Sequence, residues 1–166
     1  PNIFERPKVI IGKKPTIENT FYSSSIDVSK EVMVFPDNSI SAINSAIENG
    51  FTWVEVDVVA SNDKVLYCNH DLDLEETTDG IGYIYDHSSK NLNMLSYRDR
   101  NTKTYSEKVA KLSTVLGMFN KKINFNIEIK SKGIFDIGGA RAVAKLIKKY
   151  DTNSFIISSF NPIVVL

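Results

Sequence analysis

Two carboxylates interrupt an apolar, β-branched segment of the chain at alternate positions. Glu55 and Asp57 lie within Val54-Glu55-Val56-Asp57-Val58. Side chains two residues apart in a strand point to the same side, so both carboxylates would project from one face. Like charges on a buried face are unfavourable unless a cation lies between them. The pattern therefore predicts a hard divalent metal, Mg²⁺ or Ca²⁺, because these ions prefer oxygen ligands.

A second segment repeats this spacing in Asn126-Ile127-Glu128-Ile129-Lys130. If the two strands share a sheet, Glu128 could be a third carboxylate ligand, and Lys130 could meet a phosphate oxygen. The alternative interpretation places these charged residues on solvent-facing edges, where they form surface pairs. Charged and apolar residues also alternate in ordinary half-exposed strands, so the spacing leaves both interpretations open.

His70 directly follows a short predicted strand over residues 65–68. A histidine at the carboxyl end of a parallel strand is well placed for catalysis, because barrel active sites gather there. An imidazole gains and loses a proton near neutral pH, which suits proton transfer to a leaving alkoxide. The alternative is a loop histidine that only hydrogen-bonds locally. Cys68 is expected to be a small core residue and not a nucleophile.

Strand-like and helix-like segments alternate along most of the chain, which predicts βα units and a parallel sheet in an α/β fold. A helix is expected from Ile40 to Ile47, capped by Asn38 or Ser39 and ended by Gly50. Residues 71–110 are mostly polar, and we expect a loop-rich insertion there with one short helix near Leu92. We expect residues 1–166 to form a single domain. The other predicted strands cover residues 8–11, 53–60, 123–129 and 154–158, and the other helices residues 113–119 and 140–150.

The charge balance narrows the class of partner. The chain of 166 residues has 20 Lys plus Arg and 20 Asp plus Glu, so its formal net charge is zero. Nucleic-acid binders usually carry a basic surplus, so we expect no nucleic-acid partner, whereas a small phosphorylated ligand needs only a local positive site. The apolar runs are too short for a membrane span. The one cysteine, Cys68, favours a reducing compartment, so a cytoplasmic location is expected, with a periplasmic or secreted one left open.

Seven segments, in order, resemble the glycerophosphodiester phosphodiesterase family. Together they cover residues 36–161, and their order makes the resemblance specific although no single segment is decisive. They are Pro36-Asp37-Asn38-Ser39, Glu55-Val56-Asp57-Val58, the turn, strand and His-Asp pair from Asn62 to Asp71, Thr77-Thr78-Asp79-Gly80, Leu112-Ser113-Thr114-Val115-Leu116, Asn126-Ile127-Glu128-Ile129-Lys130 and Ser158-Ser159-Phe160-Asn161.

The resemblance implies a TIM (β/α) barrel, of which this chain would hold about six of eight strands. It implies that Glu55, Asp57 and Glu128 bind the metal, that Lys130 contacts the phosphate and acts in catalysis, and that His70 is an acid–base residue. The implied reaction is metal-assisted hydrolysis of a glycerophosphodiester to an alcohol and glycerol 3-phosphate, as part of lipid or glycerol metabolism. The metal would polarise the phosphoryl oxygen and stabilise developing charge.

The sequence departs from the family pattern in two ways. The family carries His-Arg-Gly after its first strand, but here Gly12-Lys13-Lys14 follows that strand and no histidine precedes His70. Lys13 or Lys14 could replace the charge of the arginine, with Lys13 expected to bind the substrate, although a lysine has no bidentate fork. A catalytically impaired relative that binds a phosphorylated ligand or acts as a scaffold is therefore the alternative, and a lyase that forms a cyclic phosphate is a third hypothesis. The second departure is length, because the 166 residues would form only part of the barrel. An open partial barrel would expose strand edges and favour a homo-oligomer.

Overall fold

The computed structural model describes residues 35–98, 105–151 and 154–164. Its main sheet has four strands in the order β2-β1-β5-β6 and is open at both edges within the described residues. Strands β1, β5 and β6 run parallel to one another, whereas β2 pairs antiparallel with β1. The predicted strand at residues 8–11 lies outside the described residues. The strands are β1 (Trp53–Ala60), β2 (Leu66–Cys68), β5 (Asn124–Ile129) and β6 (Phe155–Ser158).

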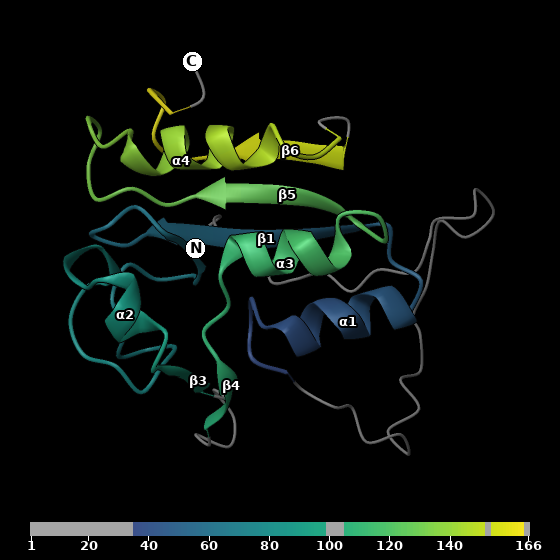
Figure 1. Ribbon diagram of the computed structural model, residues 1–166, viewed down its shortest axis with the longest axis horizontal. Helices are drawn as coiled ribbons and strands as arrows, with labels where there is room; N and C mark the ends of the chain where they lie inside the picture. The colour runs from purple at the N-terminus through teal and green to yellow at the C-terminus, as the bar shows by residue number, and fades with distance from the viewer. Residues whose placement is uncertain (1–34, 99–104, 152–153, 165–166) are drawn as a thin grey trace, which may run out of the picture.

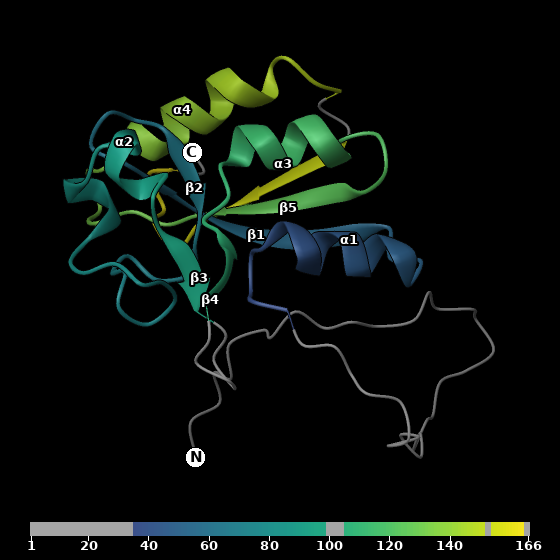
Figure 2. The same cartoon turned by 60° about the horizontal axis from the view of Figure 1, so that its bottom comes forward.

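Three helices cover one face of this sheet (Figures 1 and 2). Alternate side chains of β1 and β5 are buried in the core together with Ile43, Val115 and Val143 from these helices. The strand residues with this burial are Val54, Val56, Val58, Phe125, Ile127 and Ile129. The helices are α1 (Ile40–Glu48), α3 (Leu112–Phe119) and α4 (Gly138–Ile147). Because strand side chains alternate, the remaining residues of β1 and β5 lie on the opposite face.

The ends of α1 follow the sequence prediction. The Ser39 side chain accepts a hydrogen bond from the Ala42 amide at 3.0 Å, which satisfies one of the unpaired donors at the helix start. The helix stops at Gly50, whose φ of 80° is open to glycine at little steric cost. Asn38, the other predicted cap, instead has a φ of 64° and directs its side chain elsewhere.

One prediction about the sheet is wrong. The strand before His70 was expected to run parallel within βα units, but β2 folds back on β1 in an antiparallel hairpin. The Ser61 amide and Val65 carbonyl close this hairpin at 2.8 Å, and Lys64 takes a φ of 64° in the turn. A turn this short can join only antiparallel strands. About six barrel strands were expected, whereas the described residues contain three parallel strands, β1, β5 and β6.

The segment between β2 and α3 forms its own small structure. It contains a 3₁₀ turn at Ile84–Asp86, the expected short helix α2 (Ser89–Leu92), and two unexpected strands. These strands, β3 (Ser96–Arg98) and β4 (Tyr105–Lys108), pair antiparallel in a separate two-stranded sheet. Among the described residues, no helix combines the length and apolar character that crossing a membrane requires.

Candidate metal centre

The parallel pairing of β1 and β5 brings three carboxylates together on the polar face of the sheet. Glu55 lies opposite Asn126, and Asp57 lies opposite Glu128. One carboxylate oxygen from each of Glu55, Asp57 and Glu128 falls within 4.8 Å of the others. Asp57 and Glu128 are buried at 8% and 9% exposure, and Glu55 is half-buried. The surface-pair alternative is therefore excluded for these residues, because their oxygens converge in a partly dehydrated site.

Lys130 supplies positive charge to the cluster. Its Nζ lies 2.6 Å from Glu128 Oε1 and 2.9 Å from Asp57 Oδ1. Burial lowers the pKa of Lys130, but the carboxylates of Glu128 and Asp57 raise it by more, so the ammonium stays charged. With all three acids ionised, three negative charges and one positive charge leave the cluster at −2. A divalent cation would neutralise that charge.

Glu55 shows the electrostatic strain of the cluster. Burial raises its pKa most, the hydrogen bond from Asn126 opposes this, and the nearby charges of Asp57 and Glu128 raise it further. Asp57 Oδ1 is buried and lies 2.9 Å from the ammonium of Lys130. Three converging carboxylates with incomplete charge compensation, a raised carboxyl pKa and an all-oxygen donor set together fit Mg²⁺ or Ca²⁺.

Two asparagines orient the carboxylates. Asn38 Nδ2 donates to Asp57 Oδ2 at 3.1 Å, and its Oδ1 accepts from the Asp57 amide at 2.9 Å. Asn126 Nδ2 donates to Glu55 Oε2 at 3.1 Å and is itself held by Ser158 on β6 at 3.0 Å. Sequence analysis missed both roles. Asn126 could have been found, because it precedes Glu128 by two residues and shares its face; Asn38 gave no signal beyond its tolerance of a left-handed backbone.

His70 reaches this region through the hairpin and not through a parallel strand. The amide of Asn69, one residue before it, donates to the Asp57 carbonyl at 3.0 Å. His70 Nδ1 lies 2.8 Å from Asp71 Oδ1. A carboxylate only accepts, so this contact places the proton on Nδ1 and leaves Nε2 for another partner. Asp71 thus sets the tautomer and orientation of His70.

Neither Cys68 nor His87 belongs to the group of side chains that could hold a metal. Burial raises the pKa of the Cys68 thiol to about 12, which fits the predicted core role and an unreactive thiol. His87 Nε2 bonds the Ile81 carbonyl at 2.9 Å, within the segment that follows β2. Lys13, the predicted substrate-binding lysine, lies outside the described residues.

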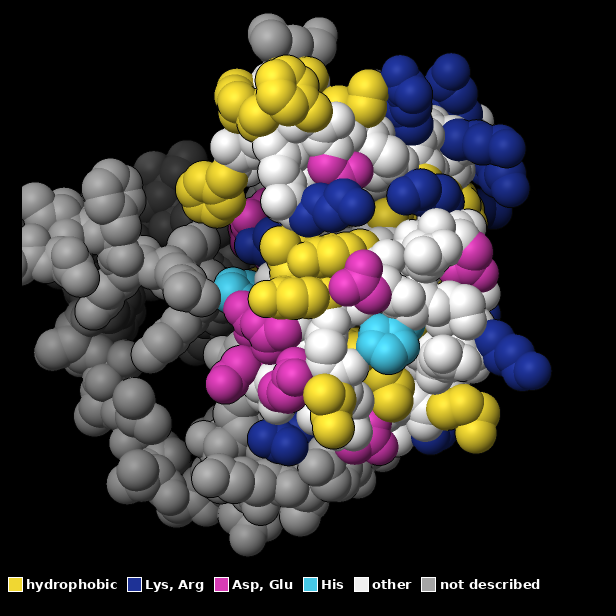
Figure 3. Space-filling model, turned by 90° about the vertical axis from the view of Figure 1, so that its left-hand side faces the viewer, with side chains coloured by type: hydrophobic (Ala, Val, Ile, Leu, Met, Phe, Trp, Pro, Cys, Tyr) yellow, Lys and Arg dark blue, Asp and Glu magenta, His cyan; other side chains and the backbone are white. Residues whose placement is uncertain are grey.

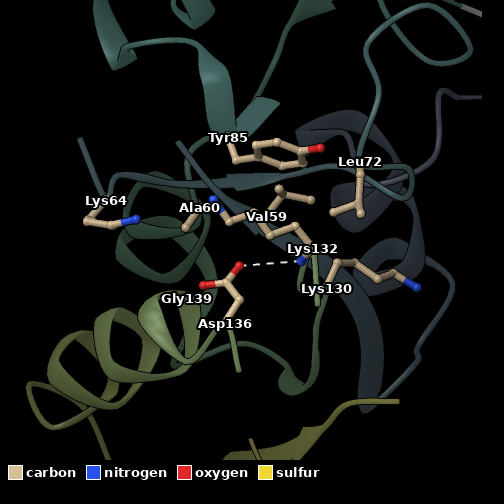
Figure 4. A pocket seen from close by; sticks show the side chains of 9 residues that line it. All are labelled: Val59, Ala60, Lys64, Leu72, Tyr85, Lys130, Lys132, Asp136 and Gly139. Carbon is tan, nitrogen blue, oxygen red and sulfur yellow. Dashed lines mark hydrogen bonds between the residues drawn. The ribbon is translucent and has the colours of Figure 1, made fainter. Parts of the chain in front are cut away.

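A small pocket lies on the other side of the Lys130 stem (Figure 4). Its volume is about 20 Å³, which is suited to a water molecule and not to a substrate. Figure 4 shows the Lys130 ammonium extending away from the other lining side chains. Asp136 closes the loop after β5 by accepting from the Lys132 amide at 3.3 Å. A ligand of Lys130 would therefore approach from the carboxylate side.

Two residues of the segment between β2 and α3 form hydrogen bonds to the start of α1 and to β2, the elements that lie next to the cluster. Glu107 accepts hydrogen bonds from the Ile40 amide at 2.8 Å and from the Ser41 amide at 3.4 Å, at the start of α1. The hydroxyl of the buried Tyr97 donates to the Cys68 carbonyl at 2.5 Å and accepts from the Ala110 amide at 3.1 Å. The entry of α1, which carries Asn38, is thereby fixed against β4 and β2.

Comparison with known proteins agrees with this arrangement. The sequence pattern described as "Glycerophosphoryl diester phosphodiesterase family" matches residues 32–164. A glycerophosphodiester phosphodiesterase of Caldanaerobacter subterraneus subsp. tengcongensis is 33% identical over 129 residues, which cover 76% of this chain and 53% of that protein. A glycerophosphodiester phosphodiesterase of Bacillus subtilis is 28% identical over 68% of this chain and 42% of its own length. The chain thus spans about half the length of the curated relatives it matches.

Solved structures show the same likeness in space. An Oleispira antarctica phosphodiesterase, in complex with the product sn-glycerol-3-phosphate, superposes with a TM-score of 0.71 at 25% identity. That match covers 78% of this chain and 54% of the other. A glycerophosphodiester phosphodiesterase from Agrobacterium tumefaciens gives a TM-score of 0.68 at 26% identity, with the same coverage of both chains. The α/β fold with its parallel strands therefore matches part of these structures.

Proposed function

This chain belongs to the glycerophosphoryl diester phosphodiesterase family, and we propose that it hydrolyses a glycerophosphodiester to an alcohol and glycerol 3-phosphate with the help of a divalent metal. The observation that carries the proposal is the convergence of Glu55, Asp57 and Glu128 beside Lys130. The matched part of the chain covers 53% and 42% of two relatives with this name, so the proposal concerns the site and its chemistry in the protein to which these residues belong.

Each residue of the cluster would have a distinct task. The three carboxylates would hold Mg²⁺ or Ca²⁺, which when bound would polarise the phosphoryl oxygen and stabilise its developing charge. Lys130, held between Glu128 and Asp57, would donate to a phosphate oxygen of the substrate. Lys13 would add a second positive charge for the phosphate. Asn38 and Asn126 would keep two of the carboxylates aligned.

His70 would handle the proton. As water adds to phosphorus, the bond between phosphorus and the alcohol oxygen breaks, and the leaving alkoxide needs a proton. The Nε2 atom of His70 would supply it, while Asp71 at 2.8 Å stabilises the charged imidazole. The strands β1, β5 and β6 would belong to a TIM barrel, in one domain that includes residues 1–166 and carries residues 71–110 as an insertion.

One observation favours a second candidate function. The chain has two histidines, His70 and His87, and His87 bonds a loop carbonyl within its own segment. The family's His-Arg-Gly motif would supply a second proton-transfer histidine beside His70, and the loss of such a group lowers the rate roughly 10²–10⁴-fold. A relative that binds a phosphorylated ligand with little turnover, or acts as a scaffold, is therefore the alternative.

Phosphorus NMR separates these functions. Glycerophosphocholine and glycerophosphoglycerol are incubated with the protein and Mg²⁺ or Ca²⁺, and the products are identified. We expect glycerol 3-phosphate, loss of the signal with a chelator, and loss in Asp57→Asn but not in the exposed control Glu76→Gln. A cyclic phosphate product would indicate a lyase. Binding of glycerol 3-phosphate without any turnover would replace the hydrolase proposal with the alternative.

A further inference from the structure

A second concave surface lies away from the carboxylate cluster. It is a groove of about 640 Å³ between α4, the β1–β2 turn and the start of α3. This volume is within the range of small-molecule binding sites. Four of its lining side chains are apolar and form the floor, namely Val65, Leu66, Ala142 and Leu146. Leu66 is buried and the other three are half-buried, so the floor continues the hydrophobic core outward.

Cations line the rim of this groove. Arg141 and Lys145 lie four residues apart on one side of α4, and Lys149 follows in the turn after the helix ends at Ile147. Lys64 lies beside Gly138 at the start of α4, since its Nζ is 3.4 Å from the position that a Cβ on Gly138 would occupy. Figure 3 shows dark blue side chains gathered on the side where α4 lies, while acidic side chains gather elsewhere on that face.

The rim has little opposing charge. Asp63 is the acid among the lining residues, and its carboxylate accepts hydrogen bonds from Ser61 Oγ at 2.7 Å and from the Ser89 amide at 2.8 Å. Four cations against one acid leave the groove at +3, whereas the whole chain has a formal net charge of zero. The positive charge is therefore concentrated around an apolar floor.

We propose that this groove binds an anionic amphiphile, with its apolar chain on the floor and its phosphate or carboxylate group between the cations of the rim. The apolar floor would contribute no binding free energy for inorganic phosphate, and the cationic rim would contribute none for an uncharged detergent. A ligand that uses both parts of the groove must therefore have both an apolar chain and an anionic group. Long lysine and arginine stems also extend the apolar surface while their charged ends meet the head group. The site is separate from the proposed hydrolysis and does not depend on it.

Dodecyl phosphate, used below its micelle concentration, is the probe. Titration into the ¹⁵N-labelled protein should give saturable binding, with shifts at groove residues. Inorganic phosphate should bind at least roughly tenfold more weakly, since burial of only two methylenes is worth about that factor. Dodecyl maltoside keeps the chain but lacks the charge, and it should also bind roughly tenfold more weakly, since a hydrogen bond to a charged group is worth about that factor. Dodecyl maltoside of equal affinity would show that charge plays no part and would overturn the proposal.

Matched variants locate the site. Ala142→Asp places a carboxylate on the floor and should weaken dodecyl phosphate binding roughly tenfold or more. Ala144→Asp makes the same change on an exposed position of the same helix and should leave binding intact. The double change Lys145→Glu with Lys149→Glu should also weaken binding, whereas Lys121→Glu with Lys122→Glu, in the turn before β5, should not.

Three results would reject the amphiphile. Equal losses in Ala142→Asp and Ala144→Asp, or shifts confined to other surfaces, would place the binding outside the groove. Inorganic phosphate of equal affinity would reduce the groove to a simple anion site. Binding of poly-glutamate at the groove without binding of dodecyl phosphate would instead identify it as a docking surface for an acidic protein segment.

Discussion

Alternate residues of β1 and β5 meet two different environments. On one face, Val56, Phe125 and Ile127 are fully buried against the helices, and packing alone satisfies them. On the other face, Glu55, Asp57 and Glu128 converge, and Lys130 balances only part of their charge. The apolar face is thus complete without a ligand, whereas the polar face carries a net negative charge that a divalent cation would neutralise. Substitutions on the apolar face should therefore change stability whether or not a cation is present, whereas substitutions on the polar face should change the response to a cation.

The largest expected effect is on the apolar face. Phe125 is fully buried and stacks on Phe155 with ring centres 6.3 Å apart. Phe125→Ala should lower the free energy of unfolding by about 3–5 kcal/mol, because it leaves a cavity in the core. Urea denaturation measures this loss, which should be the same with and without Ca²⁺. A loss that added Ca²⁺ reversed would show that the two faces are not independent.

On the polar face, Lys130→Met removes the positive charge and keeps the stem. Three carboxylates are then left without a compensating cation, and we expect the metal-free protein to lose about 2 kcal/mol, less than for a fully buried pair because Lys130 is partly exposed. Added Mg²⁺ or Ca²⁺ should restore more stability here than in the unmodified protein. Denaturation with and without each cation tests this, and an unchanged cation response would contradict a metal site at the carboxylates.

A smaller effect is expected at Asn38. Asn38→Gly tolerates the φ of 64° but removes both hydrogen bonds to Asp57. Stability should fall by about 1–2 kcal/mol, and metal affinity should fall roughly 10–100-fold, as for other residues that orient ligands. Calorimetric titration with Ca²⁺ measures the affinity. Gly50→Ala, at the other end of α1, serves as a control that changes stability alone.

The smallest effect concerns a carboxylate outside both faces. Hydrogen bonds from Ser89 and Ser61 lower the pKa of Asp63 from 3.8 to about 2. The unfolded chain therefore binds this proton at a higher pH than the folded protein does, so the contribution of Asp63 is present above about pH 4 and is lost as the pH falls toward 2. Asp63→Asn should flatten the pH dependence of stability in this window only. Acid unfolding followed by circular dichroism checks it, with Glu76→Gln as the exposed control.

Sequence reasoning succeeded where one local pattern determined the structure. The β-branched run from Trp53 to Ala60 coincides with β1, and the alternation of Glu55 and Asp57 in β1, repeated at Glu128 in β5, correctly indicated carboxylates on one face. Ser39 and Gly50 gave the ends of α1 because capping and a positive φ are local requirements. The parallel pairing that unites the carboxylates could be anticipated only through the alternation of strands and helices.

Other features depended on contacts distant in sequence. Strands β3 (3 residues) and β4 (4 residues) are too short for alternation to be recognised in the sequence, so neither was predicted, and their pairing with each other defines them as strands. The direction of β2 could have been predicted, because the Asn62-Asp63 turn is too short for a crossover. Asn38 bonds Asp57 from 19 residues away, and no pattern in the sequence indicates that contact.

The bond between Glu107 and the first turn of α1 has a consequence for redesign of this scaffold. Loop grafting between β2 and α3 would treat the segment as replaceable, since none of the three carboxylates comes from it. Yet Glu107 fixes the helix start next to Asn38, and Asn38 aligns Asp57. A graft that lacks an acid at this position should therefore retain the fold while binding a cation less well. Measuring cation affinity would then show whether a replacement segment holds the start of α1 in place.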